Sequence, residues 1–481
     1  MRQKDILLIM SDQHSYLATG FADSRVETPE LRRIAQNGAW FEHCCSNAPL
    51  CVPSRMSFLT GQMTSELEIF DNDSTISSDM PTIAHEFGRM GYHTALIGRM
   101  HFKGDDQKHG FDERLCGDIT SQYWGTGGRQ RTDFGVYAGT TNRLHCLEAV
   151  GAGDSPVTVY DRTVFEETMN YLEQWGAQGE ERPPLFLIVG FYGPHFPFVC
   201  EETLFQKYRS RFSLEECREN MQLEALPVYE ELRQECSPEL ARDCRAAYCG
   251  MVELLDGYVG ALYDRFRQTE ADRDAVFFYT SDHGEQLGKR QIFGKQTMYE
   301  DAVRVPLLAA GTGIPAGVHR ETVSLLDVSR TLLALAGETE SCKWHRGRTI
   351  DFQNADLNSG WSRIQQMLSR ESGFTFVEAA VNWPHKVVRA DDTWYVYHLK
   401  SDPQESRNLL DDGLAQAEAV LQSAMAAGCF IGAGEIEQII KKEQELYDRH
   451  VRLTAWGRRK APKEWASVAM PPGSLSGPVR E

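Results

Sequence analysis

Short, nearly continuous apolar runs alternate with segments of helical period along the first two thirds of the chain. The apolar runs predict buried strands at 6–10, 94–98, 185–191 and 275–280. Apolar residues recur at helical spacing in four segments, 29–37, 81–90, 164–175 and 240–266. Gly38 and Gly91 follow the first two of these as stop signals. This βαβ succession predicts an α/β fold with a large, mostly parallel sheet covered by helices.

The pattern changes after about residue 350. Three short runs at 374–381, 385–390 and 394–399 are typical of antiparallel strands, and 415–427 and 436–447 are typical of helices. We therefore expect a catalytic domain at 1–350 and a smaller α+β subdomain at 351–481. The subdomain's tail at 462–481 is expected to be mobile. The Gly- and Thr-rich stretch 125–153 predicts a long loop on the substrate side.

Composition narrows the class of protein. The chain has 481 residues, of which 41% are hydrophobic and 25% charged, as in ordinary globular enzymes. Its net charge of −19 disfavours nucleic acid or an anionic membrane as a partner, so an anionic substrate would need a local basic pocket. No run reaches the roughly 20 apolar residues of a membrane span, and the run 6–10 is too short for a secretory signal. We expect a cytoplasmic protein whose 12 scattered cysteines are mostly reduced thiols.

Two predicted strands are followed by side chains that can bind a metal. Asp12 and Gln13 follow the first strand, and Asp282 and His283 follow the strand at 275–280. The carboxyl ends of parallel strands meet at one edge of the sheet, where ligands bind. Their oxygen atoms suit Ca²⁺ or Mg²⁺, and the imidazole also admits Mn²⁺. For either aspartate taken alone, a helix cap is the commoner explanation.

The pentapeptide 51–55, CVPSR, carries a second signal. Pro53 suits the first turn of a helix that runs to Leu59, which places Cys51 at the helix N-terminus. Free backbone N–H groups and the helix dipole favour a bound oxyanion there. Arg55 lies one turn further along the same side. The alternative is a buried structural cysteine beside a surface arginine.

The pentapeptide resembles the CxPSR motif of the type I sulfatases in the alkaline phosphatase superfamily, and five further segments match that family in order. They are GRMH at 98–101, GPHFP at 193–197, SDHGE at 281–285, the run from GK at 294–295 to RVPL at 304–307, and YHL with DPQE and NL at 397–409. Segment 98–111 is most similar to choline sulfatase and its phosphonate and phosphodiester hydrolase relatives. One departure is Arg99, where the family has lysine.

The resemblance implies an alkaline phosphatase-like fold and an enzyme that hydrolyses sulfate esters. Its nucleophile would be a formylglycine made from Cys51 by a maturation enzyme, hydrated to a gem-diol that attacks sulfur. One divalent metal, with Ca²⁺ expected first and Mg²⁺ or Mn²⁺ as alternatives, would be held by Asp12, Cys51, Asp282 and His283, while Gln13 stays open as a ligand.

The resemblance also implies roles for the remaining site residues. The catalytic set would be Cys51, Arg55, His101, His195 and Lys295. Arg99, Lys295 and His195 would bind the sulfate. His195 and Lys295 would act at the leaving-group oxygen, and His101 would be the base that deprotonates the second hydroxyl. Arg99 keeps the positive charge of the family lysine but is a poor proton donor, so Lys103 is a candidate substitute.

Three functions stay open at this point. The first is a sulfatase for a small-molecule or saccharide sulfate ester, and the second is a phosphonate monoester or phosphodiester hydrolase with the same site. The third is a binding protein whose Cys51 is never converted. Tyr123, Trp124 and Trp383 are candidates to line the substrate pocket, although aromatic residues are more often packing residues. Assembly into a homo-oligomer is left open.

Overall fold

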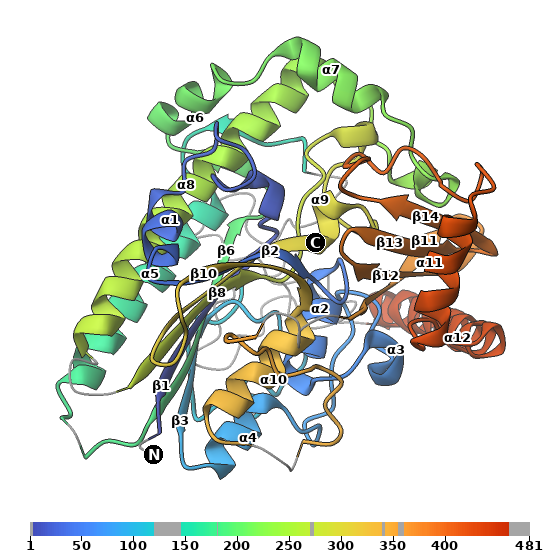
Figure 1. The fold of residues 1–481 in the computed structure, drawn as a ribbon. Coiled ribbons are helices and arrows are strands. Elements are labelled where there is room, and N and C mark those ends of the chain that lie inside the picture. The colour runs from blue at the N-terminus through green and yellow to red at the C-terminus, as the bar shows by residue number, and fades with distance from the viewer. Residues whose placement is uncertain are drawn as a thin grey trace.

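The computed structural model describes residues 3–119, 146–179, 181–269, 274–338, 342–354 and 360–460, with side chains up to residue 449. Its centre is an eight-stranded sheet with helices on both faces (Figure 1). In spatial order the strands are β10 (Gly317–Ser324), β2 (Gly38–Cys45), β9 (Arg304–Gly311), β8 (Ala275–Ser281), β1 (Asp5–Asp12), β6 (Leu185–Pro194), β3 (His93–Gly98) and β4 (Glu113–Leu115). Among these strands β9 alone runs antiparallel to its neighbours, so the prediction of a mostly parallel sheet is confirmed.

The residues of β1 alternate between two apolar cores, one on each face of the sheet. Leu7 and Ile9 face the core under α1 (Pro29–Ala35), α5 (Pro156–Gly176) and α8 (Pro238–Thr269). Ile6, Leu8 and Met10 face the core under α2 (Cys51–Thr60), α4 (Ile83–Arg89) and α10 (Leu325–Leu335). Because β1 is buried on both faces, its sequence is a continuous apolar run.

Shorter elements connect these layers. They are η1 (Tyr16–Ala18), α3 (Thr64–Leu67), β5 (Val150–Ala152), β7 (Phe198–Cys200), α6 (Glu202–Arg209), α7 (Leu214–Gln222), η4 (Pro227–Leu232), η5 (Lys289–Gln291) and α9 (Glu300–Val303). β5 and β7 form a small parallel pair, so the predicted loop 125–153 ends in a strand. Residues 125–145 of that prediction lie outside the described residues. Among the described helices, none is both long and apolar enough to cross a membrane.

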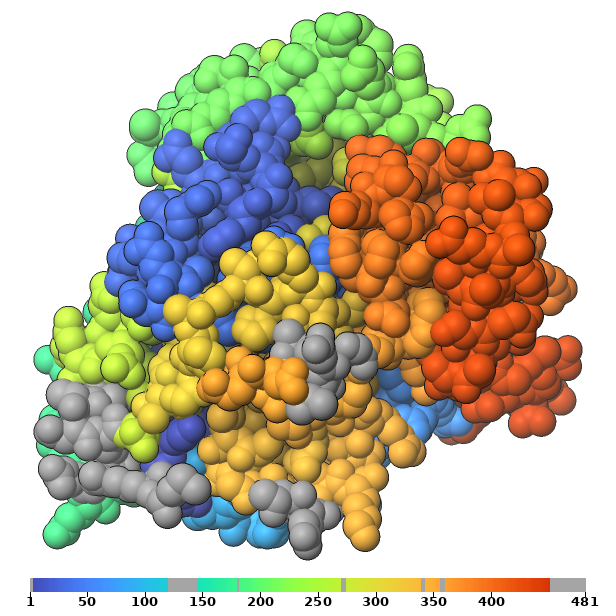
Figure 2. Space-filling view, in the orientation of Figure 1, coloured from blue at the N-terminus to red at the C-terminus, as the bar shows by residue number. Residues whose placement is uncertain are grey.

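The C-terminal part forms the predicted antiparallel sheet and helices. The sheet has the order β11 (Ser362–Arg370), β12 (Gly373–Asn382), β13 (His385–Ala390), β14 (Thr393–His398), and α11 (Ala415–Ala426) and α12 (Ala433–Lys460) follow. Figure 2 shows this part, in orange and red, packed against the rest of the molecule. Lys386, buried on β13, connects the C-terminal part to the rest of the molecule. Its Nζ lies 2.8 Å from a carboxylate oxygen of Glu300 in α9 and 2.8 Å from one of Glu405 in the C-terminal part.

Several predicted elements are longer in the structure, and others were missed. The strand predicted at 185–191 extends to Pro194, and the helix predicted at 164–175 begins at Pro156. Strands β2, β10 and β11 were not predicted, since polar residues interrupt their apolar runs. Strand β9 was missed although residues 305–311 are apolar, because Pro306 argues against a central strand. The predicted tail at 462–481 lies outside the described residues. The division into domains at 350/351 stays a prediction.

A glycine in β6 lets the chain carrying Arg99 approach the sheet. A Cβ atom added at Gly190 would lie 1.8 Å from the carbonyl oxygen of Arg99. We expect Gly190→Ala to reduce the free energy of unfolding by about 3 kcal/mol, the upper end of overpacking costs. Gly257→Ala on α8 is the control, because a Cβ there meets nothing within 4 Å. This change should instead stabilise by about 0.5–1 kcal/mol. Equal effects of the two substitutions in urea denaturation would contradict the steric argument.

Candidate active site

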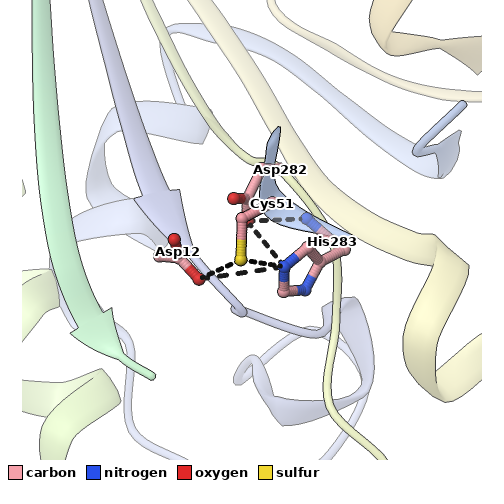
Figure 3. A group of neighbouring side chains, drawn as sticks. All are labelled: Asp12, Cys51, Asp282 and His283. Atoms are coloured by element: carbon pink, nitrogen blue, oxygen red, sulfur yellow. Dashed lines mark hydrogen bonds and ion pairs between the residues drawn. The ribbon is translucent and has the colours of Figure 1, made fainter. Parts of the chain in front are cut away.

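The predicted metal-binding residues and Cys51 meet at the carboxyl edge of the sheet. Asp12 is the last residue of β1, Asp282 and His283 follow β8, and Cys51 is the first residue of α2. One ligand atom from each lies within 4.8 Å of the others, and all four residues are buried. Figure 3 shows the four side chains pointing toward one another. The edge predicted from strand ends is therefore where these groups gather.

Two buried arginines orient the carboxylates. Arg55 donates from Nε to Asp282 Oδ2 (2.8 Å) and from Nη2 to Asp12 Oδ2 (3.2 Å). Arg99 Nε donates to the same Asp12 Oδ2. The other oxygen, Asp12 Oδ1, faces Cys51 Sγ at 3.7 Å and His283 Nε2 at 3.8 Å. The arginines thus occupy one oxygen of Asp12 and leave the second directed into the cluster.

The imidazole of His283 is held so that its Nε2 points into the cluster. Its Nδ1 lies 3.0 Å from the carbonyl oxygen of Gly284 and donates to it. Without a metal, burial lowers the pKa of His283 but the Asp282 carboxylate and Cys51 together raise it more, so the pKa lies above its ordinary value and the protonated ring places a positive charge beside Cys51. A metal ligand must be the neutral ring, whose lone pair is then on Nε2, 3.2 Å from Cys51 Sγ. Two carboxylates and this nitrogen fit a divalent cation, with oxygen donors that suit Ca²⁺ or Mg²⁺. The residues present therefore fit the metal expected from the sequence.

Gln13, the uncertain metal ligand, is engaged elsewhere. Its backbone takes a positive φ of 72°, and its side-chain Oε1 accepts from Lys295 Nζ at 2.7 Å. Its Nε2 donates to the Glu285 carboxylate. The described contacts give Gln13 a role in holding Lys295, and its role as a metal ligand stays a prediction.

Cys51 lies where a negative charge is stabilised. Lys295 Nζ lies 3.1 Å from its Sγ, and the pKa of the thiol lies below the ordinary value. Burial and the Asp12 carboxylate raise this pKa, but the charges of Lys295 and His283 outweigh them. The residue sits at the N-terminus of α2, as predicted from Pro53. The site therefore favours an anionic group at the position of Sγ.

Asn72 is a site residue that the sequence analysis missed. Its Oδ1 accepts from Val52 N at 3.0 Å and so caps α2 from a distant loop. Its Nδ2 is consequently turned toward Cys51 Sγ, at 3.8 Å. A single asparagine 21 residues after Cys51 carries no local pattern that would have identified it.

The predicted residues Arg99 and His101 form a network with an unpredicted one, Asp118. Arg99 Nη1 donates to Asp118 Oδ1 at 3.0 Å, and its Nη2 lies 2.8 Å from His101 Nδ1. Asp118 Oδ2 accepts from the backbone N of His101 at 2.8 Å and from Arg114 Nη2 at 3.0 Å. His101 thus joins the cluster through Arg99 and Asp118. Asp118 was missed because β4 (Glu113–Leu115), the short strand before it, was not predicted and no motif marks it.

His195 completes the ring of polar groups. It follows β6, and its Nδ1 lies 2.7 Å from the carbonyl oxygen of Phe196 while its Nε2 lies 4.0 Å from Asp12 Oδ1. Burial and the charge of Lys295 hold its pKa well below the ordinary value. Lys103, suggested as a substitute cation, is buried near this network and lies 3.5 Å from Asp73.

The aromatic residues suggested for the substrate pocket are not placed beside Cys51 by the described contacts. Tyr123 and Trp124 lie outside the described residues. Trp383 follows β12 and stacks on His43, with ring centroids 3.7 Å apart, in contact with Arg304. Its part in substrate binding stays a prediction.

The fold and the site together define a class of protein, an α/β protein with a metal-competent, cation-lined site for an oxyanion. The family model "Sulfatase" matches residues 4–338. The choline-sulfatase of Rhizobium meliloti (strain 1021) is 33% identical over 443 residues, covering 85% of this chain and 82% of the relative. The chain belongs to the sulfatase family, and the predicted class, sulfuric ester hydrolases of the alkaline phosphatase superfamily, is confirmed.

Two further similarities cover most of the chain. A multifunctional alkaline phosphatase superfamily protein of Trinickia caryophylli is 26% identical over 480 residues, covering 86% of this chain and 92% of the relative. The structure of a phosphonate monoester hydrolase from Silicibacter pomeroyi superposes with a TM-score of 0.66 at 20% identity, covering 88% of this chain and 96% of that chain. The latter shows a shared fold.

A metal-binding test follows from the geometry of His283. We expect Ca²⁺ added to the chelator-treated protein to stabilise it, by about 2.7 kcal/mol at a concentration 100 times Kd. His283→Ala removes one ligand while leaving the arginine partners of Asp12 and Asp282 in place, and should weaken Ca²⁺ binding at least about tenfold. Titration calorimetry and thermal unfolding measure both effects.

The control variant is Glu338→Gln, in a second group of neighbouring ligand-type side chains formed by Glu86, Glu338 and Cys342. It should leave Ca²⁺ binding unchanged. If Glu338→Gln and His283→Ala weakened binding equally, the cluster at Asp12 would not be the metal site.

Proposed function

We propose that this chain hydrolyses a sulfate ester to an alcohol and inorganic sulfate, with a formylglycine made from Cys51 as nucleophile and a divalent cation, Ca²⁺ first, beside it. The observation that carries the proposal is the convergence of Asp12, Asp282 and His283 on Cys51 at the start of α2. A buried cysteine in an apolar core would have a raised pKa, as Cys45 does, whereas that of Cys51 is lowered.

The formylglycine and the metal would each supply one kind of chemistry. Hydrated formylglycine provides an oxygen nucleophile in place of the thiol. A cation held by Asp12, Asp282, His283 and the oxygen of the formylglycine at position 51 would lower the pKa of that oxygen and balance charge on the substrate.

The chain's own residues then bind and orient the ester. Lys295 lies next to the nucleophile's position and neutralises charge on the sulfuryl oxygens, and its ammonium can donate a proton to the leaving oxygen. His195 Nε2 lies 4.0 Å from Asp12 Oδ1, the oxygen that faces Cys51, and is the second candidate to act at the leaving-group oxygen. Arg55 and Arg99 add positive charge and hold Asp12 in place. Burial of all these groups strengthens each interaction.

The substrate is proposed to be a small-molecule or saccharide sulfate ester. The 33% identity to a choline-sulfatase makes choline sulfate the first natural ester to assay. The same site geometry could serve a phosphonate monoester or a phosphodiester, so turnover must be compared among these classes.

The test is turnover by protein produced together with a formylglycine-generating enzyme. We expect an aryl sulfate to be hydrolysed faster than an aryl phosphonate or an aryl phosphate diester. Cys51→Ala should abolish turnover, and Lys295→Met should lower kcat about 10²–10³-fold, as loss of one oxyanion donor does. The control Cys429→Ala removes a buried cysteine of the C-terminal part and should leave turnover unchanged.

Faster turnover of the phosphonate or the diester would replace the sulfatase by the second hydrolase. Absence of turnover with every ester, in protein whose Cys51 is converted, would contradict the proposal.

A further inference from the structure

Asp118 gathers three groups that belong to the site. It accepts from Arg99 Nη1 (3.0 Å), from the backbone N of His101 (2.8 Å) and, more weakly, from the backbone N of Met100 (3.3 Å). Its side chain is 1% exposed, so its charge is removed from water and balanced by Arg99 and Arg114. Such a carboxylate holds its donors in a fixed arrangement.

Arg99 connects Asp118 to Asp12, the carboxylate expected to bind the metal. The three guanidinium nitrogens reach three different residues, because Nε donates to Asp12, Nη1 to Asp118 and Nη2 to His101. The guanidinium also lies over the ring of Tyr192, with its Cζ 3.9 Å from the centroid. A planar fork fixed at four points cannot rotate without breaking several contacts. Lysine, which the family has here, carries its three N–H donors on a single nitrogen, so it lacks the planar fork that reaches Asp12, Asp118 and His101 from three separate atoms.

The contact with Arg99 also determines which ring nitrogen of His101 carries the proton. A guanidinium only donates hydrogen bonds, so Nδ1 of His101 must be the acceptor. A neutral imidazole with Nδ1 unprotonated carries its proton on Nε2. Burial and the charge of Arg99 hold the pKa of His101 well below its ordinary value, which is consistent with a neutral ring. His283 and His195 have the opposite arrangement, since Nδ1 of each donates to a backbone carbonyl.

We propose that Asp118 is a positioning residue that acts through Arg99, orienting Asp12 for the metal and fixing His101 as a hydrogen-bond donor at Nε2. The inference rests on the proposed function for its role in catalysis. It changes the expected role of His101, because a ring already protonated at Nε2 and bonded at Nδ1 has no free nitrogen to act as a base. Arg99 in turn serves as a clamp for Asp12 more than as a direct sulfate ligand.

The first test compares Asp118 with Asp5, a second buried aspartate that binds an arginine and a backbone N–H. Asp5 begins β1, whereas Asp12 ends it, and Asp5 accepts from Arg182 Nη1 (2.8 Å) and from Leu185 N. We expect Asp118→Asn to weaken Ca²⁺ binding by the full-length protein about 10–100-fold in calorimetry, as loss of an outer partner of a metal ligand does. Asp5→Asn should lower Tm but leave Ca²⁺ binding unchanged.

Arg99→Lys provides a second variant should Asp118→Asn fail to fold, and it should weaken Ca²⁺ binding by a similar factor. Unchanged affinity in the folded variants, or an equal loss in Asp5→Asn, would overturn the positioning role.

The second test uses NMR to determine which ring nitrogen of His101 carries the proton in the unsubstituted protein. NMR spectra of protein labelled with ¹⁵N-histidine should show, at neutral pH, a protonated Nε2 and an unprotonated Nδ1 for His101. The His101 signals are assigned by their loss in His101→Gln. A proton on Nδ1 would overturn the proposal. Neither test needs converted Cys51 or turnover. Failure of the unsubstituted protein to bind any divalent metal would count against the proposed function, while the His101 spectrum would still decide this inference.

Discussion

The carboxylate of Asp12 is buried at the centre of the molecule, and its charge is balanced by the guanidinium groups of Arg55 and Arg99. Burial alone would raise the pKa of Asp12, but these and neighbouring cations, Arg99 foremost, hold it well below the ordinary value. An unpaired charge in such a place would cost several kcal/mol, so the two arginines and Asp12 depend on one another. The rest of the site follows from this pairing. It leaves one oxygen of Asp12 facing Cys51.

The sheet supplies the positions at which this pairing forms. β1 lies between β6 and β8 in parallel register, so Asp12, Asp282 and His195 all emerge at the same edge. α2 begins at this edge with Cys51, and Ser54 fixes the helix by donating to the carbonyl oxygen of Asp282 at 2.7 Å. A chain of net charge −19 therefore holds a local group of cations where an anion is to be bound. Local arrangement outweighs the overall charge because burial removes the screening by water.

The elements that the sequence predicted correctly are those in which one physical requirement determines the pattern. β1 and β8 are buried on both faces and so read as apolar runs, and the metal-competent residues follow directly at their ends. β2 was missed because Glu42 and His43 interrupt its apolar residues, and β9 because Pro306 argues against a central strand. Asn72 and Asp118 could not be found in this way. Each acts through a contact between segments that are distant in the sequence, and a single polar residue gives no periodic signal.

The measurement that tests the central claim most directly is mass spectrometry of the peptide containing Cys51, from protein produced with and without a formylglycine-generating enzyme. The account predicts the mass loss of thiol-to-aldehyde conversion only when that enzyme is present, and release of sulfate from an ester only by the converted protein. An unmodified Cys51 in the presence of a competent maturation enzyme would contradict the sulfatase mechanism and favour a binding protein.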